Sequence, residues 1–363
     1  MKVRKLTLKN YRNIRDLTFS PSEGINIIFG ENAQGKTNLI EALWLFTGCK
    51  SFRTSKDSEL VNFNESFSVA ELEFYAFERE QTAKIVNEKK QKAFLNGVEL
   101  SSPSKLIGEF TTVVFSPVHL SLIKDGPAAR RRFIDVALCQ LKPRYAAFLQ
   151  KYNKALHQRN FLLKDVQYHS ELLDTLDVWD ERLCQLATVI IKERLDYIKK
   201  LTPAAKEIYS GLSDGKEEMG ISYSSLADFS SMSEDEIYFE LMKLIKKNRK
   251  EDILQKSTSV GPHRDDIEIT VNSLSARSFG SQGQQRSCAI ALKLGEAEIV
   301  SSFTGEKPVA LLDDVMSELD ESRQDYILNK IKDWQVFITC CDENQVLRLC
   351  EGKTFEMKDG RLL

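Results

Sequence analysis

One segment of the sequence has the residue types and spacing needed to hold phosphate groups. Residues 30–37 read GENAQGKT and match the pattern GxxxxGK[ST], the P-loop. The glycines of such a loop let backbone N–H groups face phosphate oxygens, the lysine reaches the β- and γ-phosphates, and the last hydroxyl binds Mg²⁺. We therefore expect a nucleotide site, with Thr37 as a magnesium ligand, that consists of Gly30, Glu31, Asn32, Ala33, Gln34, Gly35, Lys36 and Thr37.

A pair of adjacent acids is the second chemical candidate. Residues 308–314 read PVALLDD, an apolar strand that ends in Asp313 and Asp314. Asp313 at the strand tip is suited to hold Mg²⁺, and Asp314 beside it is suited to polarise an attacking water. Adjacent acids after a strand are also common as helix N-caps. Together with the P-loop, they predict a catalytic set that includes Lys36, Asp313 and Asp314.

A third candidate lies between these two motifs. Residues 279–286 read FGSQGQQR and precede a helix-forming run over residues 289–300. Ser281 and Gly283 at a helix start would form an anion-binding nest, although a serine N-cap explains the same pattern equally well. The segment precedes the acidic strand, as the signature motif does in ABC-type ATPases, and this position favours the first interpretation.

The segments around these motifs predict an α/β fold. Residues 25–29 are continuously apolar, as in a strand buried on both faces, and residues 38–46 carry apolar residues at helical spacing. The P-loop therefore joins a strand to a helix. Short apolar strands are expected again at residues 309–312 and 336–339. Further strand patterns occupy residues 3–8, 17–19, 69–77, 83–86, 111–115 and 267–271.

The middle of the chain has a helical pattern. Long helices over residues 133–163 and 172–201 are expected to pack as an antiparallel hairpin, followed by a polar stretch over residues 211–233. A heptad-like apolar stripe marks the second helix, and ordinary helix packing explains it more simply than an extended coiled coil.

The order of these patterns predicts the domain organisation. The α/β pattern begins before the helical region and resumes after it, which indicates a helical domain inserted into one ATPase domain. We expect a discontinuous ATPase domain over residues 1–125 and 255–363, with a mainly helical insert domain over residues 126–254.

Composition narrows the class of protein further. The 363 residues are 42% hydrophobic, and they contain neither a run of 18 apolar residues nor a secretory-type start, so we expect a cytoplasmic protein that does not associate with membranes. The seven cysteines form no CxxC pair, which favours free thiols over a structural zinc site. A formal net charge of −2 gives no support for nucleic-acid binding, so any such interpretation depends on local clusters.

The motifs in their order resemble a known family. GENAQGKT, SQGQQ, LLDD and SELD at residues 317–320 are similar to an ABC-type P-loop ATPase head of the SMC branch. Four further segments narrow the resemblance to the RecF family of bacterial recombination proteins, over essentially the whole chain. They are KNYRN at residues 9–13, VVFSP at 113–117, GPAARRRFID at 126–135 and VGPHRDD at 260–266.

The resemblance implies an ATP-dependent DNA clamp. Its cofactors would be ATP and Mg²⁺, and its ATPase activity would be weak and stimulated by DNA. Two copies would form an ATP-dependent homodimer on double-stranded DNA near gaps or junctions. With the mediator protein RecR as a partner, the dimer would help to load recombinase onto gapped DNA in recombinational repair and replication restart.

The resemblance also implies roles for single residues. Arg12 would reach the phosphates of the nucleotide, although a surface arginine in a turn is the simpler alternative. Ser281 and Gly283 would contact the γ-phosphate of an ATP held by the other subunit, which adds Ser281 to the catalytic set. Asp320 would lie at the seam between the two subunits.

Two departures from the wider ABC-type pattern affect the expected rate. The glutamate that usually follows the magnesium-binding aspartate is Asp314 here, and its shorter side chain would hold water less well, so we expect slow hydrolysis. The histidine that usually follows the next strand is absent, which leaves Thr339 as the nearest candidate to sense the γ-phosphate.

Basic residues after position 120 are candidates for DNA contacts. Lys124, Arg130, Arg131 and Arg132 could contact DNA phosphates, but a solvated or internally ion-paired cluster explains them as well. His263, in the segment VGPHRDD with Arg264, is not expected to be a catalytic base.

Two other functions share the P-loop. One is the nucleotide-binding subunit of a membrane transporter, against which the long helical insert and the missing histidine argue. The other is a P-loop kinase or a GTPase, in which SQGQQ would be only a helix cap, and the sequence has no NKxD stretch for guanine recognition. A kinase would transfer phosphate to a small acceptor, which an ADP-release assay would reveal.

Overall fold

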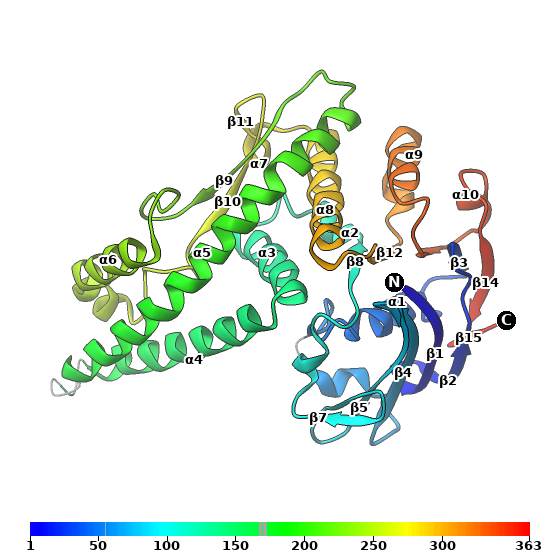
Figure 1. Ribbon diagram of the computed structural model, residues 1–363, viewed down its shortest axis with the longest axis horizontal. Helices are drawn as coiled ribbons and strands as arrows, with labels where there is room; N and C mark the ends of the chain where they lie inside the picture. The colour runs from blue at the N-terminus through cyan, green and yellow to red at the C-terminus, as the bar shows by residue number, and fades with distance from the viewer. Residues whose placement is uncertain (55, 167–168, 170–172) are drawn as a thin grey trace.

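The computed structural model describes residues 1–54, 56–166, 169 and 173–363. The chain forms two lobes (Figure 1), which we call the sheet lobe and the arm. The sheet lobe holds two six-stranded sheets and both chain termini. The arm extends away from it and contains the helices α3 (Pro127–Leu141), α4 (Pro143–Asp165), α5 (Leu173–Leu212) and α6 (Glu234–Gln255).

A mainly parallel sheet of order β15-β14-β3-β13-β12-β8 forms the centre of the molecule. Its strands are β3 (Ile25–Phe29), β8 (Thr112–Phe115), β12 (Val309–Asp313), β13 (Val336–Cys340), β14 (Lys353–Lys358) and β15 (Arg361–Leu362). Neighbouring residues of one strand enter different cores, since Ile27 packs in one hydrophobic cluster and Ile28 in the other. Both faces are therefore covered, which explains the continuous apolar runs predicted for these strands.

An antiparallel sheet of order β2-β1-β4-β5-β6-β7 covers one face of the lobe. Its strands are β1 (Lys2–Tyr11), β2 (Ile14–Phe19), β4 (Ser68–Ala76), β5 (Arg79–Asn87), β6 (Lys92–Leu95) and β7 (Val98–Leu100). Every second residue of β4 is buried, as expected for a strand with one face on the core. The helix α1 (Lys36–Leu45) shares this core, so the P-loop helix packs between the two sheets.

The helices of the arm differ from the prediction in two places. The helix expected over residues 133–163 is broken at Lys142, because a residue before a proline is disfavoured in helical conformation, and α4 begins at Pro143. The second helix continues to Leu212 through Pro203, and its predicted start at residue 172 lies outside the described residues. As predicted, α4 and α5 pack together as a hairpin (Figure 1).

A small sheet in the arm corrects the predicted placement of one strand. The strand over residues 267–271 was expected among the strands of the ATPase domain, but β10 (Asp266–Val271) pairs with β9 (Met219–Ser224) in a sheet of order β11-β10-β9. The strand β9 lies inside the segment predicted to be a polar stretch. The expected domain boundary after residue 254 thus falls between two paired strands of one sheet.

The helix α8 (Gln282–Thr304) joins the lobes, because it packs against α5 of the arm and β8 of the central sheet. The remaining elements are short: α2 (Pro117–Leu120), β11 (Leu274–Ser275), α7 (Ala276–Phe279), α9 (Glu321–Lys330), α10 (Asn344–Leu347) and the 3-10 turns Asp57–Leu60, Pro103–Leu106 and Met316–Glu318. No helix within the described residues is long and apolar enough to cross a membrane. All seven cysteines are free.

Candidate nucleotide site and inter-lobe cleft

The P-loop leaves β3 through a backbone turn that requires glycine. Gly30 and Gly35 have φ angles of 147° and 115°, in the left-handed region that side chains disfavour. A Cβ on Gly30 would lie 2.3 Å from the carbonyl oxygen of Met357, and a Cβ on Gly35 would lie 2.9 Å from Oδ1 of Asn13. The loop therefore has both the backbone conformation and the close surroundings that its motif predicts.

Lys36 is the first residue of α1 and lies across the P-loop. Its Nζ donates to the carbonyl oxygens of Gly30 at 2.7 Å and Glu31 at 2.9 Å, and the residue is only 4% exposed. No carboxylate of a described residue forms an ion pair with this ammonium, and a buried ammonium without such a partner is costly. A phosphate group would supply the missing negative charge, which is the chemistry expected of this lysine.

The acidic strand and the next strand meet the P-loop at one edge of the central sheet. Thr37 Oγ1 donates to Asp313 Oδ1 at 3.0 Å, and Thr339 Oγ1 donates to the same oxygen at 2.9 Å. The Asp314 N–H in turn donates to Thr339 Oγ1 at 2.9 Å. Because β12 and β13 are parallel neighbours with Asp313 opposite Thr339, their carboxyl ends place these groups together, as in other open α/β sheets.

The pair of Thr37 and Asp313 fits Mg²⁺. Burial raises the pKa of the Asp313 carboxyl, and the hydrogen bonds from Thr339 and Thr37 offset part of this rise. A divalent cation beside Asp313 would stabilise its buried carboxylate and neutralise phosphate charge. Mg²⁺ takes few protein ligands, and within the described ranges no group of three or more His, Cys, Asp or Glu residues could hold a metal alone.

Asp314 adopts a left-handed backbone conformation directly after β12. Its φ angle is 52°. Two hydrogen bonds stabilise the turn: the Asp314 N–H donates to Thr339 Oγ1, and Ser317 Oγ donates to the Asp314 carbonyl oxygen at 2.9 Å. Aspartate tolerates this conformation better than most residues, so the turn places the Asp314 side chain directly after the tip of β12.

Arg12 lies near the P-loop helix but binds a protein group instead of facing the loop. Its Nη2 donates to Glu41 Oε1 at 2.8 Å, and its Nε donates to Glu41 Oε2. Glu41 is fully buried and also accepts from Tyr11 and Ser51. The sequence contains a sign of this pair. Glu41 is the one acid among the apolar residues of α1, and a buried acid needs a basic partner such as Arg12.

Sequence reasoning missed a polar chain that reaches the P-loop from the side. Arg53 Nη1 donates to Asn38 Oδ1 at 2.5 Å, Asn38 Nδ2 donates to Asn13 Oδ1 at 2.7 Å, and Asn13 Nδ2 donates to the Ala33 carbonyl oxygen at 3.3 Å. Arg53 also lowers the pKa of Asp313 through its charge, although burial has the larger, opposite effect. Arg53 Nη1 also lies 3.7 Å from Glu41 Oε2, so Arg12 and Arg53 share the same buried acid.

The C-terminal hairpin supports the tip of the P-loop. The Gly360 N–H donates to the Gln34 carbonyl oxygen at 3.0 Å, and the Asp359 N–H donates to Gln34 Oε1 at 2.6 Å. Met357 contacts the loop from the same hairpin. No sequence pattern could have indicated these contacts, because they join residues more than 300 positions apart.

Ser281 begins α8 with a capping box. Ser281 Oγ accepts from the Gln284 N–H at 3.2 Å, and Gln284 Oε1 accepts from the Ser281 N–H at 2.8 Å. Gly283 is partly buried, and its carbonyl oxygen accepts from Arg323 Nη2 at 3.2 Å. Asp320 caps α9 through the Arg323 N–H at 3.0 Å and is ion-paired with the Arg323 side chain. The serine is thus a helix cap in this chain.

A cavity of about 460 Å³ opens beside Ser281 and Gly283. It is lined by the loop after α5 and by Arg323, and no residue of the P-loop lines it. The P-loop of the same chain therefore takes no part in this cavity.

Comparisons with known proteins identify the family of this chain. The family model "RecF/RecN/SMC N terminal domain" matches residues 2–359. The protein named "DNA replication and repair protein RecF" from Acetivibrio thermocellus is 44% identical, over 98% of this chain and 100% of its own length. The chain belongs to the RecF family. The protein of the same name from Clostridium perfringens is 40% identical over 100% of this chain and 99% of its own length.

Solved structures extend the likeness to three dimensions. A structure described as the recombination mediator protein RecF-ATP in the RecFOR pathway is 37% identical and has a TM-score of 0.91, over 100% of this chain and 97% of that one. An SMC head domain from Pyrococcus furiosus is 17% identical with a TM-score of 0.54, and it shows the fold alone. The RecF-family chain thus has an ABC-type P-loop ATPase head, as predicted.

The candidate DNA residues of this RecF-family chain separate into two groups. Arg130 is 3% exposed, and its Nε and Nη2 donate to the two carboxylate oxygens of Asp266, each at 2.8 Å. It cannot reach DNA, which corrects the prediction for this residue. Lys124 and Arg132 are exposed. Arg131 is partly exposed, and its Nη1 donates to the Asp265 carbonyl oxygen at 2.7 Å.

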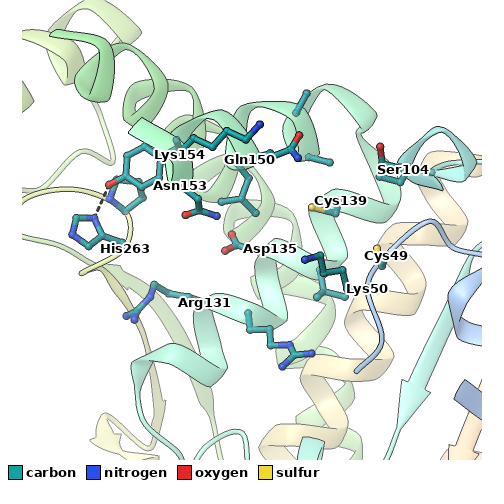
Figure 2. A pocket seen from close by; sticks show the side chains of 18 of the residues that line it. Cys49, Lys50, Ser104, Arg131, Asp135, Cys139, Gln150, Asn153, Lys154 and His263 are labelled. Carbon is teal, nitrogen blue, oxygen red and sulfur yellow. Dashed lines mark hydrogen bonds between the residues drawn. The ribbon is translucent and has the colours of Figure 1, made fainter. Parts of the chain in front are cut away.

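A cavity of about 1180 Å³ separates the sheet lobe from α3 and α4, and we call it the inter-lobe cleft. Figure 2 shows Lys50, Arg131 and Lys154 around this space, with Asp135 between them. Among the described residues, Asp135 is the only acid that lines the cleft, and it is ion-paired with Arg194 at 2.8 Å. The cleft is therefore positively charged through Lys50, Lys105, Arg131, Arg132 and Lys154.

His263 lies at the wall of the cleft with both ring nitrogens in use. Its Nε2 lies 3.0 Å from the Thr258 carbonyl oxygen, so Nε2 carries the proton, and Nδ1 accepts from Tyr152 Oη at 2.6 Å (Figure 2). Burial lowers the pKa of His263 to about 4. These bonds make His263 a structural residue that ties α4 to the segment before β10.

Proposed function

We propose that the chain binds MgATP at the P-loop and hydrolyses it slowly. The observation that carries this proposal is the hydrogen bond from Thr37 to Asp313, which brings the P-loop helix and the acidic strand tip together beside Lys36. Asp314 would orient the attacking water, and its side chain, one methylene shorter than glutamate, would do so less effectively. Thr339 would sense the γ-phosphate, because its hydroxyl contacts both acids.

The proposal includes an ATP-dependent homodimer. Ser281 and Gly283 line a cavity to which the P-loop of their own chain contributes no residue, and we propose that a second chain brings its P-loop and nucleotide to this cavity. Two ATP molecules would then be held between two chains, with Asp320 at the seam. A helix N-terminus such as that of α8 is a favourable place for a phosphate group.

Double-stranded DNA is the proposed macromolecular ligand. The exposed Lys124 and the cations of the inter-lobe cleft would contact phosphates without reading sequence. The RecF structures similar to this chain are described as recombination mediator proteins of the RecFOR pathway. We place this chain in the same process, acting in the cytoplasm with RecR at gapped DNA to help load recombinase, and with DNA stimulating its ATPase.

The first test is the solution mass of the protein with ATP, with ADP and without nucleotide, in the presence and absence of a gapped duplex. Asp314→Asn would slow hydrolysis and preserve the ATP state, and Lys36→Ala is the control that should not bind nucleotide. A dimer that forms only with ATP and retains the duplex is the expected result. A monomer under all conditions, with or without the duplex, would contradict the proposed ATP-dependent dimer.

A further inference from the structure

Glu217 connects the arm to the segment SQGQQ at residues 281–285. It lies in the loop between α5 and β9, where both of its carboxylate oxygens accept hydrogen bonds. Tyr209 Oη, from the last turns of α5, donates to Glu217 Oε2 at 2.7 Å, and Gln284 Nε2, from the first turn of α8, donates to Glu217 Oε1 at 2.6 Å. One side chain thus joins the longest helix of the arm to the helix that begins at Ser281.

Gln284 is also hydrogen-bonded to Ser281. Its Oε1 accepts from the Ser281 N–H at 2.8 Å while its Nε2 donates to Glu217. An amide can donate only through nitrogen and accept only through oxygen, so the two contacts fix the orientation of the Gln284 amide. A continuous chain of hydrogen bonds therefore runs from Tyr209 through Glu217 and Gln284 to Ser281.

The same loop forms a wall of the cavity beside Ser281. Glu217, Ser281 and Gln284 all line the cavity of about 460 Å³, together with Arg323. The end of α5 also packs on α9, since a Cβ on Gly211 would lie 2.5 Å from Tyr326 Oη. A change in the tilt of α5 would thus move Glu217 relative to the start of α8.

We propose that Glu217 is a positioning residue, which holds Gln284 and thereby orients Ser281 for the ATP of the partner subunit. This inference rests on the proposed function, because it assumes that Ser281 acts on a nucleotide held by a second chain. It adds a means by which the arm and the nucleotide affect each other. An arm that shifts on DNA would loosen or tighten the contact of Ser281, and a bound nucleotide would in turn favour one position of α5.

Three variants test the role of Glu217. Glu217→Ala removes both acceptor oxygens. Glu217→Gln keeps one acceptor oxygen, so it can retain the bond from Gln284. Glu218→Ala is the matched control, since Glu218 is the neighbouring acid and its exposed side chain pairs with Lys206 at 2.9 Å. For each variant we would measure binding of a fluorescent ATP analogue, the ATP-dependent monomer–dimer equilibrium, ATP turnover and the thermal midpoint of unfolding.

The expected result separates positioning from folding. Glu217→Ala should bind the analogue as the wild type does but dimerise about tenfold more weakly with ATP, as the loss of one charge-assisted hydrogen bond predicts. Glu217→Gln should recover most of this loss, and Glu218→Ala should behave as the wild type.

Two other results would overturn the inference. One is wild-type dimerisation and turnover of Glu217→Ala, and the other is a loss that follows the thermal midpoint and is not rescued by Glu217→Gln. If the wild-type protein itself fails to dimerise with ATP, the proposed function is at fault and not the role of Glu217.

Discussion

Thr339 Oγ1 lies 2.9 Å from Asp313 Oδ1 and also 2.9 Å from the Asp314 backbone nitrogen. A single hydroxyl at the end of β13 therefore donates to the proposed magnesium-binding acid and accepts from the residue that would orient water. This relationship makes the position of both acids depend on Thr339.

The first prediction concerns this hydroxyl. Thr339→Val keeps the shape of the side chain but removes the donor to Asp313 and the acceptor for Asp314, so ATP turnover should fall about tenfold. Binding of ATP should change little, because Lys36 and the P-loop backbone are unaffected. Steady-state turnover and equilibrium binding of a nucleotide analogue would measure the two effects. Thr339→Ser retains the hydroxyl and should keep near-normal turnover; equal losses in both variants would contradict the argument.

The second prediction concerns a buried ion-pair cluster in the arm. Arg159, Asp180 and Asp252 are all fully buried, and Arg159 lies 2.6 Å from Asp180 Oδ1 and 2.7 Å from Asp252 Oδ2. Arg159→Met would remove the cation that Asp180 and Asp252 share, although Asp180 keeps its ion pair with Arg249, and it should lower the free energy of unfolding by about 3 kcal/mol. Urea unfolding followed by circular dichroism would measure the loss.

The control for this prediction is an exposed pair on α6. Lys243→Met removes the ion pair with Glu240, in which Lys243 Nζ lies 3.1 Å from Glu240 Oε2. Such a change should stay within about 0.5 kcal/mol of the wild type. If Arg159→Met were equally mild, the cluster would not stabilise the arm.

The nucleotide site could be predicted from sequence because its parts are local. The strand, loop and helix around residues 25–46 are consecutive, and Asp313 ends a buried parallel strand whose carboxyl end must lie at the same edge as the P-loop. Long-range partners could not be predicted in this way. The contact of Gln34 with Asp359 and the pairing of β9 with β10 depend on how distant segments meet.

Arg130 is a case in which more could have been inferred. Arg130, Phe133, Ile134 and Ala137 follow the three- and four-residue spacing of one helix face, and all four are buried. The spacing therefore indicated that Arg130 faces the core and needs an acid there, which the structure supplies as Asp266. The adjacent Arg131 and Arg132 point elsewhere because successive residues of a helix do not share a face.

The third prediction separates these arginines by their effect on DNA binding. Arg132→Ala should weaken binding to a gapped duplex and reduce the slope of log affinity against log salt by about 1, as the loss of one phosphate contact predicts. Arg130→Met should leave that slope unchanged but lower the thermal midpoint of unfolding, because it removes the ion-pair partner of Asp266. Lys243→Ala, which does not line the cleft, is the charge-matched control. An unchanged slope for Arg132→Ala would remove this residue from the DNA interface.

The fourth prediction is a dependence of stability on pH that arises from His263. Burial lowers its pKa to about 4 in the folded protein, whereas the unfolded chain should titrate near the ordinary value of about 6.5. Between these values the unfolded state binds the proton and the folded state does not, so stability is fully present above about pH 6.5 and is lost as the pH falls toward 4.

The size of this effect follows from the difference between the two pKa values. His263 should account for a loss of up to about 3 kcal/mol across this window, an upper value because the ring is partly exposed. Unfolding free energies of the wild type and of His263→Gln, measured from pH 7.5 to pH 5, would test it, since glutamine can hydrogen-bond but does not titrate. The variant should be less stable at pH 7.5 but show a shallower decline toward pH 5. Parallel curves would mean that other groups cause the acid sensitivity.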